Sequence, residues 1–371
     1  MRFSLIGPVY PYRGGIAHYN SLLNQALQNY AHVTQMVSFK RQFPQWLYPG
    51  RSDKDPSKFP IISNANYILD PFYPWTWLKC IQMVQNFQPD LVAIQWWTTF
   101  WAIPFGIISS GLRRHGKRTV YIIHNVLPHE GRIWDPILAR FALGKSDNYI
   151  VQSKQEQNRM IKLIPGAQTD ICTLPVFPIF SSGNISQQDA RNKLNIPLNR
   201  SVVLFFGIVR EYKGLDVLID AIGLLSNNPN PPFLIIAGEF WDPISNYQEQ
   251  INMLGLNNRI IIENRYIPDE EVGVYFSAAD MLVAPYTGGT QSAVSKVAIG
   301  YGLPIIVTEQ IAEGIGVDYS CLVKVVPSGD AQALAIAIND QFLQSGKLTN
   351  NQKSTQEDWY RIVSLLEDLA R

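Results

Sequence analysis

The stretch SVVLFFGIVREYKGLDVLIDAIGLL, residues 201–225, decides the fold class of this 371-residue chain. Residues 201–206 are apolar on both faces, as a buried parallel strand is, and they run directly into Gly207. An amphipathic segment follows at residues 215–225. The pattern therefore predicts a strand, a short loop and a helix, the unit from which parallel sheets covered by helices are built.

The same alternation continues on both sides of this stretch. In the first half we expect strands at residues 3–7, 33–38, 91–96, 119–124 and 148–152, with helices such as 17–28 and 136–144. In the second half we expect further strands at residues 233–237, 259–263, 281–284 and 304–307, with helices at 246–254, 270–278, 291–301 and 356–369. The sequence therefore predicts an α/β protein of two Rossmann-like, doubly wound domains facing each other across a cleft.

The domain boundaries follow from a change in composition. Residues 181–199 are polar and lack strand character, so they are expected to connect an N-terminal domain, 1–180, to a C-terminal domain, 200–352. We expect the last helix, residues 353–371, to return to the N-terminal domain. In doubly wound sheets ligands bind beyond the carboxyl ends of the strands, so functional residues should follow strands directly.

Composition excludes several classes of protein. With 46% hydrophobic and 16% charged residues, the chain is neither disordered nor a coiled coil, and no nucleic-acid-binding tail is expected. Its three cysteines are far apart and predict neither a disulfide framework nor a zinc site, which favours a reducing, cytoplasmic location. The N-terminus lacks a signal-peptide pattern, and the longest apolar run, residues 100–108, is too short to span a bilayer.

Charge is unevenly distributed along the chain. Residues 1–180 carry 18 Lys and Arg against 9 Asp and Glu, whereas the remainder carries a net −8. This indicates an anionic partner such as phosphate or anionic lipid, or else an ordinary uneven surface. The run WAIPFGIISSGLRRHGKR, residues 101–118, fits a helix resting on an anionic membrane or a buried helix with a basic C-terminal end. We expect the buried helix.

Two segments of the C-terminal half have the chemistry of an anion site. Arg210 and Lys213 follow an apolar strand and precede a helix, and Thr290 and Ser292 stand where another helix begins. Fixed cations, hydroxyls and helix N-termini together suit a pyrophosphate. The alternative is a pair of solvated loop cations and two ordinary helix caps.

A resemblance to a known family rests on six segments spread over the chain. They are GPVYPYRGGIAHYN (7–20), HNVLPHE (124–130), FFGIVREYKGLDVLIDA (205–221), IIAGEF (235–240), RYIPDEEVGVYFSAADMLVAPY (265–286) and AIGYGLPII (298–306). Together they resemble the retaining glycosyltransferases of family 4, which have the GT-B architecture. The resemblance implies transfer of a sugar from a nucleoside-diphosphate-sugar to an acceptor hydroxyl, with the anomeric configuration retained and no metal or other cofactor.

The resemblance also implies partners. The N-terminal domain would hold an acceptor that is lipid-linked, a glycan or a small metabolite, and the C-terminal domain would hold the nucleotide-sugar. No nucleic acid is expected as a partner. The charge of the basic N-terminal domain, and not the resemblance, points to weak peripheral contact with the inner face of a membrane.

Site residues are carried over position by position. His124 corresponds to a histidine near the reacting sugar, and Arg210 and Lys213 to the pair that neutralises the leaving diphosphate, so these three are the catalytic candidates. The donor-binding candidates are Gly14, Gly15, Gly207, Glu239, Tyr266, Ile267, Thr290, Gln291 and Ser292. The family's usual pair of glutamates is absent, since Gly289 and Val297 occupy those positions. This resembles a variant branch in which Gln291 or a backbone amide would bind the sugar.

Candidates for the acceptor side come from histidines and aromatic residues near strand ends. They are His18, Trp96, Trp97, Asn125, His129 and Glu130. Aromatic rings stack on sugars, but a tryptophan is as readily part of a core, and a histidine at a strand end is often structural.

Other functions are weaker interpretations. Asp53 and Asp55 form a D-x-D pattern in a polar stretch that follows no apolar strand, so we expect no metal site there. The missing glutamates motivate one alternative, a nucleotide-sugar-binding scaffold without transferase activity. A nucleotide-sugar epimerising hydrolase on the same architecture is another.

Overall fold

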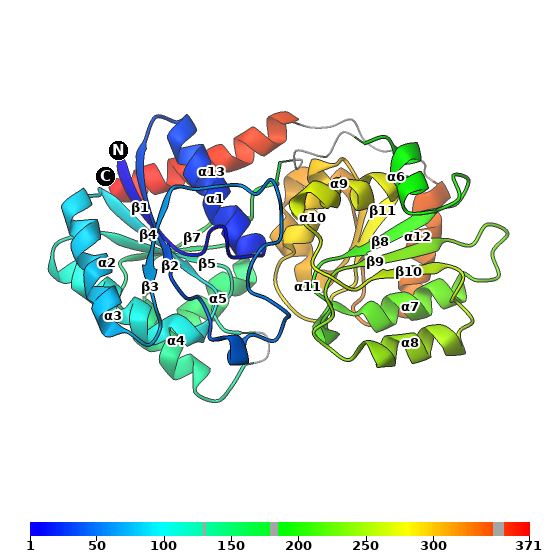
Figure 1. Ribbon diagram of the computed structural model, residues 1–371, viewed down its shortest axis with the longest axis horizontal. Helices are drawn as coiled ribbons and strands as arrows, with labels where there is room; N and C mark the ends of the chain where they lie inside the picture. The colour runs from blue at the N-terminus through cyan, green and yellow to red at the C-terminus, as the bar shows by residue number, and fades with distance from the viewer. Residues whose placement is uncertain (129–130, 179–184, 344–351) are drawn as a thin grey trace. The chain divides into compact units, whose positions relative to one another are not determined.

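A computed structural model describes residues 1–128, 131–178, 185–343 and 352–371. The chain forms two compact units. The first comprises Met1–Asp55, Pro60–Thr173 and Gln356–Arg371, and the second comprises Pro56–Phe59 and Leu174–Thr355. Each unit contains one parallel sheet, of seven and six strands respectively, so the predicted α/β class and the two Rossmann-like sheets are confirmed (Figure 1).

The sheet of the first unit has the strand order β3-β2-β1-β4-β5-β6-β7. In that order the strands are Ala65–Leu69, Val33–Phe39, Arg2–Ile6, Leu91–Trp96, Thr119–Ile123, Asn148–Val151 and Thr169–Ile171. The helices are α1 (Gly15–Asn29), α2 (Pro74–Phe87), α3 (Ala102–Arg114), α4 (Asp135–Leu143), α5 (Lys154–Leu163) and α13 (Gln352–Ala370). The core lies between the sheet and the apolar sides of α2 to α5.

The opposite face of this sheet is covered by α1 and by the C-terminal helix α13, which lie together in Figure 1. Tyr19 of α1 packs on Trp359 of α13, and His32, just beyond α1, bonds Glu367 across 2.7 Å. Residues from the two ends of the chain therefore build one side of the first unit.

The sheet of the second unit repeats the same order with β10-β9-β8-β11-β12-β13. These strands are Ile260–Glu263, Phe233–Ala237, Val202–Phe206, Met281–Ala284, Ile305–Thr308 and Val323–Val326. The helices are α6 (Gln187–Lys193), α7 (Leu215–Leu224), α8 (Ile244–Met253), α9 (Asp269–Ala278), α10 (Ala293–Gly300), α11 (Glu309–Ala312) and α12 (Ala331–Leu343). Apolar clusters fill both faces of the sheet.

Part of the expected connection between the domains is integrated in the second unit. Residues 187–193 form α6, whose Arg191 is buried, donates to the carbonyl of Ala278 and pairs with Asp280 across 2.9 Å. The expected connection at 181–184 lies outside the described residues.

The basic run at residues 101–118 forms the buried helix that we expected. Phe105, Ile108 and Leu112 of α3 are fully buried, and Arg113 and Arg114 stand in its last turn, where cations complement the helix dipole. In the described part of the chain no helix is both long and apolar enough to cross a bilayer.

Candidate functional site

The order of strands in the second unit creates a binding position. The strands β8 and β11 are neighbours, but the chain continues from β8 to β9 toward one edge of the sheet and from β11 to β12 toward the opposite edge. Ligands of doubly wound sheets bind at such a point, beyond the carboxyl ends of the two strands. Gly207 after β8 lies against Val294 in the first turn of α10, because a Cβ at Gly207 would be 3.3 Å from Cγ2 of Val294. The segments that follow β8 and β11 therefore meet.

Lys213 is the buried cation of this position. It ends the short helical turn Glu211–Lys213, and its Nζ lies 3.6 Å from the place that a Cβ of Gly207 would take and 5.5 Å from the ring centre of Tyr286. Burial lowers the pKa of Lys213, and the charge of Arg210 lowers this pKa further. An ammonium that has lost water in this way gains more from a bound anion than an exposed one would.

Arg210 is held beside an aromatic ring. Its Cζ lies 5.2 Å from the ring centre of Trp241, and the indole Nε1 of Trp241 donates to the carboxylate of Glu239 across 3.2 Å. Glu239 is buried, and its backbone carbonyl accepts a hydrogen bond from Val209. The loops after β8 and β9 are thus tied together, so Arg210, Glu239 and Trp241 form one group.

The hydroxyls at the start of α10 have different roles. Ser292 is the N-cap, accepting from the backbone amide of Ser295 at 3.2 Å, and α10 begins at Ala293. Thr290 is only 2% exposed, and its Oγ1 has no hydrogen-bond partner among the residues that the structure describes. Buried hydroxyls are normally paired, so this one is a candidate for a ligand contact. Gln291, between them, is half-buried.

The phenol of Tyr286 completes the position. Burial raises its pKa to about 12, and a hydrogen bond with Ser292 acts in the opposite direction. Tyr286 therefore stays a neutral phenol between the ammonium of Lys213 and the N-terminus of α10. Neither Tyr286 nor Trp241 was a candidate from the sequence, although both follow strands within or beside the motifs that carry the resemblance.

Tyr266 and Ile267 follow β10 in the same sheet. The side chain of Ile267 is buried in the core beneath α9, whereas Tyr266 is half-buried. Of the two, Tyr266 is the one that keeps surface for a nucleotide base.

In the first unit the glycine loop leads into α1. Gly14 is the N-cap of this helix with φ of 108°, and no atom of the described residues lies within 4 Å of the Cβ that a larger residue would have there. Gly15 is the first, exposed residue of the helix. One turn further, Nε2 of His18 lies 3.7 Å from a carboxylate oxygen of Asp55. The space at Gly14 is open, as an approaching ligand requires.

His124 is buried at the end of β5 within a chain of hydrogen bonds. Its Nε2 donates to Oε1 of Gln95 (2.8 Å), and the amide nitrogen of Gln95 donates to Oδ1 of Asn20 (3.0 Å). On the other side, the amide nitrogen of Gln152 donates to Nδ1 of His124 (3.2 Å). These contacts define a neutral imidazole with its proton on Nε2.

Burial lowers the pKa of His124 to about 3, in agreement with this neutral state. The other members of the network, Gln95, Asn20 and Gln152, were not candidates from the sequence. A signal was present, because Gln95 is a polar residue inside the apolar strand LVAIQW and Gln152 directly follows another strand.

The expectation for Trp96 needs correction. Its ring is fully buried against Tyr121, and its Nε1 donates to the carbonyl of Val126, so no ring surface is left for an acceptor. Trp97 is half-buried beside Phe39, and Asn125 is half-buried after β5. Two further acceptor-side candidates, His129 and Glu130, lie outside the described residues.

Comparison with known proteins gives two family matches in succession along the chain. Residues 13–175 match the description Glycosyltransferase Family 4, and residues 200–342 match Glycosyl transferases group 1. The matched ranges together cover most of the chain and include both sheet edges described above.

Curated relatives agree with these matches over shorter ranges. D-inositol 3-phosphate glycosyltransferase from Corynebacterium glutamicum (strain R) is 30% identical over 157 residues, which are 41% of this chain and 35% of the relative. The putative glycosyltransferase YtcC of Bacillus subtilis (strain 168) is 28% identical over 185 residues, 47% of this chain and 45% of the relative. The chain thus spans between a third and a half of the length of these relatives.

Solved structures resemble the whole chain. Sucrose-phosphate synthase from Thermosynechococcus elongatus superimposes with a TM-score of 0.69 and 19% identity, over 100% of this chain and 98% of that one. Anabaena HepE in complex with UDP-glucose gives a TM-score of 0.69 and 20% identity, over 99% and 98%. The chain therefore belongs to the family 4 glycosyltransferases, within the glycosyl transferases of group 1, and has their GT-B fold.

Proposed function

We propose that this protein is an enzyme that transfers a sugar from a nucleoside-diphosphate-sugar to an acceptor hydroxyl, with retention of the anomeric configuration. The single observation that carries the proposal is the buried ammonium of Lys213 at the sheet edge where α10 also begins. A buried cation is unfavourable unless an anion accompanies it, and a diphosphate supplies that anion.

The chemistry follows from where charge develops. As the bond between the sugar and the diphosphate breaks, negative charge grows on the departing phosphate oxygens. Lys213, Arg210 and the N-terminus of α10 stabilise this charge more in the transition state than in the bound donor, so they lower the barrier. The guanidinium of Arg210 can bind two oxygens at once, and the hydroxyl of Thr290 can donate to a third.

His124 has a different role from an acid or a base. A group with a pKa of about 3 is neutral at physiological pH, and both of its ring nitrogens are already engaged. We therefore assign it the positioning of groups near the reacting sugar, with Gly14 and Gly15 leaving room for the ligand. Because Lys213, Arg210 and a helix N-terminus supply the positive charge, the proposal assigns no role to a metal, and turnover in EDTA should equal turnover in its absence.

The donor to test first is UDP-glucose, because the structurally similar HepE was solved with it. Acceptors to screen are lipid-linked sugars, glycans and small metabolites, which share a free hydroxyl. At the family's two glutamate positions, Gly289 has no side chain and Val297 has an apolar one, so neither supplies a carboxylate to the donor. We propose that Gln291 or a backbone amide binds the sugar hydroxyls instead.

The decisive experiment is Lys213→Ala. Loss of one such donor of positive charge lowers turnover by on the order of 100-fold or more. The matched control is Lys324→Ala, which removes a lysine of the same unit that is paired at the surface with Asp340. Near-normal release of nucleoside diphosphate by Lys213→Ala contradicts the proposal, and so does an equal loss in Lys324→Ala.

The absence of carboxylates at Gly289 and Val297 also motivates a second candidate, a protein that binds nucleotide-sugars without transferring the sugar. The two candidates differ in slow hydrolysis of the donor without acceptor. If several nucleotide-sugars bind the protein and raise its unfolding temperature but none is hydrolysed, the result favours the scaffold. Release of free sugar at a rate independent of any acceptor favours an epimerising hydrolase.

A further inference from the structure

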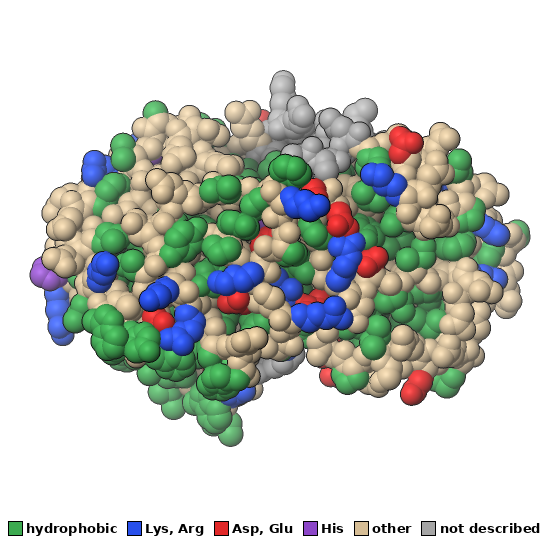
Figure 2. Space-filling model, viewed as in Figure 1, with side chains coloured by type: hydrophobic (Ala, Val, Ile, Leu, Met, Phe, Trp, Pro, Cys, Tyr) green, Lys and Arg blue, Asp and Glu red, His purple; other side chains and the backbone are tan. Residues whose placement is uncertain are grey.

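An apolar surface lies on the outer side of α4 and the residues just before it. We call it the α4 patch and define it by Ile133, Trp134, Ile137 and Phe141. Their exposed fractions are 93%, 53%, 72% and 43%. Figure 2 shows hydrophobic side chains gathered at the lower left of the molecule, over the position of α4 in Figure 1.

This surface lies on the side of α4 that does not pack against the core. The inner side, with Ala139, Ala142 and Leu143, is fully buried against the core, and Phe141 borders α3 at Gly106. A surface helix of a globular protein normally exposes polar residues opposite its apolar side. Contiguous exposed apolar side chains at this position therefore indicate contact with another apolar phase.

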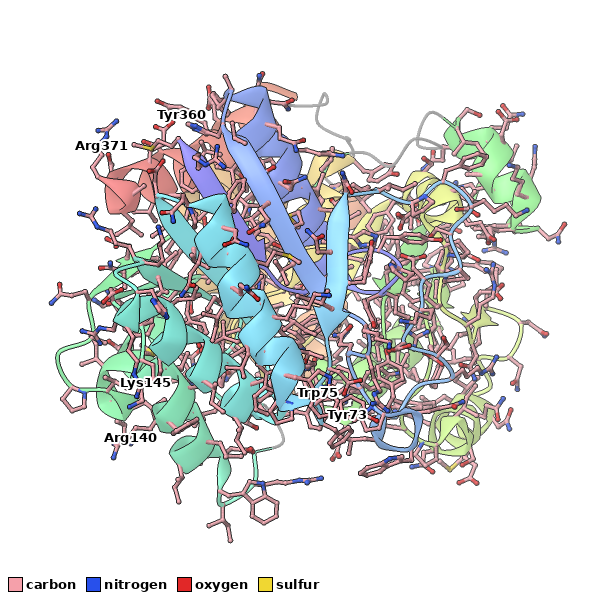
Figure 3. All side chains as sticks on the ribbon, turned by 60° about the vertical axis from the view of Figure 1, so that its left-hand side comes forward. Tyr73, Trp75, Arg140, Lys145, Tyr360 and Arg371 are labelled. Atoms are coloured by element: carbon pink, nitrogen blue, oxygen red, sulfur yellow. The ribbon has the colours of Figure 1, made fainter. Side chains whose placement is uncertain are left out.

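The exposed charges of residues 131–146, which include α4, are all of one sign. Arg132, Arg140 and Lys145 are exposed, and Arg140 and Lys145 lie at the outer side of the unit in Figure 3. The single acidic residue of residues 131–146, Asp135, is buried and accepts hydrogen bonds from the hydroxyl of Thr99 and the amide of Arg132. Residues 131–146 thus border the patch with cations and present no exposed carboxylate.

Further cations lie near the C-terminal end of α4. There Arg113 and Arg114, which belong to α3, line one surface depression together with Lys145. At the N-terminal end, the guanidinium of Arg132 lies 5.6 Å from the ring centre of Trp134. Apolar side chains flanked by Trp and basic residues are the composition of helices that lie in the surface of an anionic bilayer.

We propose that the first unit docks through the α4 patch on an anionic lipid bilayer, with Ile133, Trp134, Ile137 and Phe141 inserted at the headgroup level. Arg132, Arg140, Lys145 and Arg114 then face the lipid phosphates. This goes beyond the proposed function and does not depend on it, since lipid binding needs neither donor nor acceptor. It also moves the membrane contact away from residues 101–118, whose apolar side chains are largely buried.

The test is flotation of the purified chain with two kinds of unilamellar vesicles, in the absence of any nucleotide-sugar. One kind is pure phosphatidylcholine, and the other is an equimolar mixture of phosphatidylcholine and phosphatidylglycerol. The protein should float with the anionic vesicles only, and raised salt should release it. Equal flotation with both kinds, or with neither, overturns the proposal.

Two sets of variants assign the binding to the patch. Ile133→Ser with Ile137→Ser should lower the vesicle partition coefficient by about 10-fold, since two inserted side chains are lost. Arg140→Gln with Arg114→Gln and Lys145→Gln should lower it by on the order of 100-fold on anionic vesicles. The matched control is Met253→Ser, which removes an equally exposed apolar side chain (81%) from α8 in the second unit.

All of these positions are exposed, so the variants should keep the unfolding temperature of the parent. Vesicle binding by Ile133→Ser with Ile137→Ser that equals the parent's overturns the proposal. So does a reversible dimer, seen by sedimentation, that this double variant abolishes while vesicle binding is absent, because the patch would then bind a second copy of the chain.

Discussion

The carboxyl edges of the two sheets share one topology and differ in chemistry. In the first unit, beyond β1, β4 and β5, three buried neutral side chains, His124, Gln95 and Asn20, are hydrogen-bonded in a chain. In the second unit, beyond β8 and β11, lie the buried ammonium of Lys213 and the buried hydroxyl of Thr290, which has no partner within the described ranges. The comparison shows that the strand order decides where a ligand binds, and that the side chains at this position decide which kind of ligand binds there.

The physical basis of the difference is desolvation. Burial lowers the pKa of both His124 and Lys213. A histidine responds by losing its proton and joining a neutral network, whereas a lysine starts from a far higher pKa, and a bound anion favours its charged form. In the function that we propose, the first edge therefore receives neutral hydroxyls, and the second edge a diphosphate.

The largest expected effect is a difference in stability between alanine substitutions at two glycines, one at a crowded position and one at an open position. Gly238, after β9, has no room for a Cβ, which would lie 1.9 Å from the carbonyl oxygen of Gly207. Gly238→Ala should lower the free energy of unfolding by about 4 kcal/mol, since backbone atoms must move. Gly14→Ala, where nothing lies within 4 Å, should lose only about 1 kcal/mol, from its positive φ. Denaturant unfolding measures both, and equal losses would contradict the contrast.

The next effect concerns the neutral edge and pH. The pKa of His124 is about 3 in the folded chain and near 6.5 when unfolded, so the unfolded state binds the extra proton between these values. Stability is then complete above about pH 6.5 and falls on acidification, by about 3 kcal/mol at pH 4. The variant His124→Gln should not lose this part of the free energy of unfolding on acidification. Unfolding followed from pH 7 to pH 4 measures it, and identical pH profiles for the two proteins would show that His124 is not held neutral.

The smallest effect tests the ring beside Arg210. Trp241→Phe removes the hydrogen bond to Glu239 and weakens the contact of the guanidinium with the ring. We expect the KM for the donor to rise about threefold with little change in kcat, because Phe keeps a ring beside the half-buried guanidinium and a cation–π contact contributes little. Trp134→Phe is the matched control, since Trp134 also lies beside an arginine but in the first unit. A loss in kcat without a change in KM would place Trp241 in the reaction itself.

The sequence predicted the central strands better than the edges of the sheets. The inner strands of both sheets are apolar on both faces, and the sequence pattern predicted their positions correctly. The strands β3, β7 and β13, which lie at sheet edges and are only partly buried, were missed. An edge strand can do with less apolar surface, which weakens its sequence pattern. The edge strand β10 was predicted because it begins with three successive isoleucines.

The sequence by itself determined the family, the two parallel sheets and the position of Arg210 and Lys213 after a strand, because these depend on local pattern and spacing. Only the tertiary structure decided that Trp96 belongs to the core, that His124 is a neutral member of a network, and that Thr290 and Ser292 have different roles. It also decided that α4 exposes the apolar side chains of the α4 patch, whereas those of α3 are largely buried. Burial and hydrogen-bond partners come from residues distant in sequence, and no local pattern contains them.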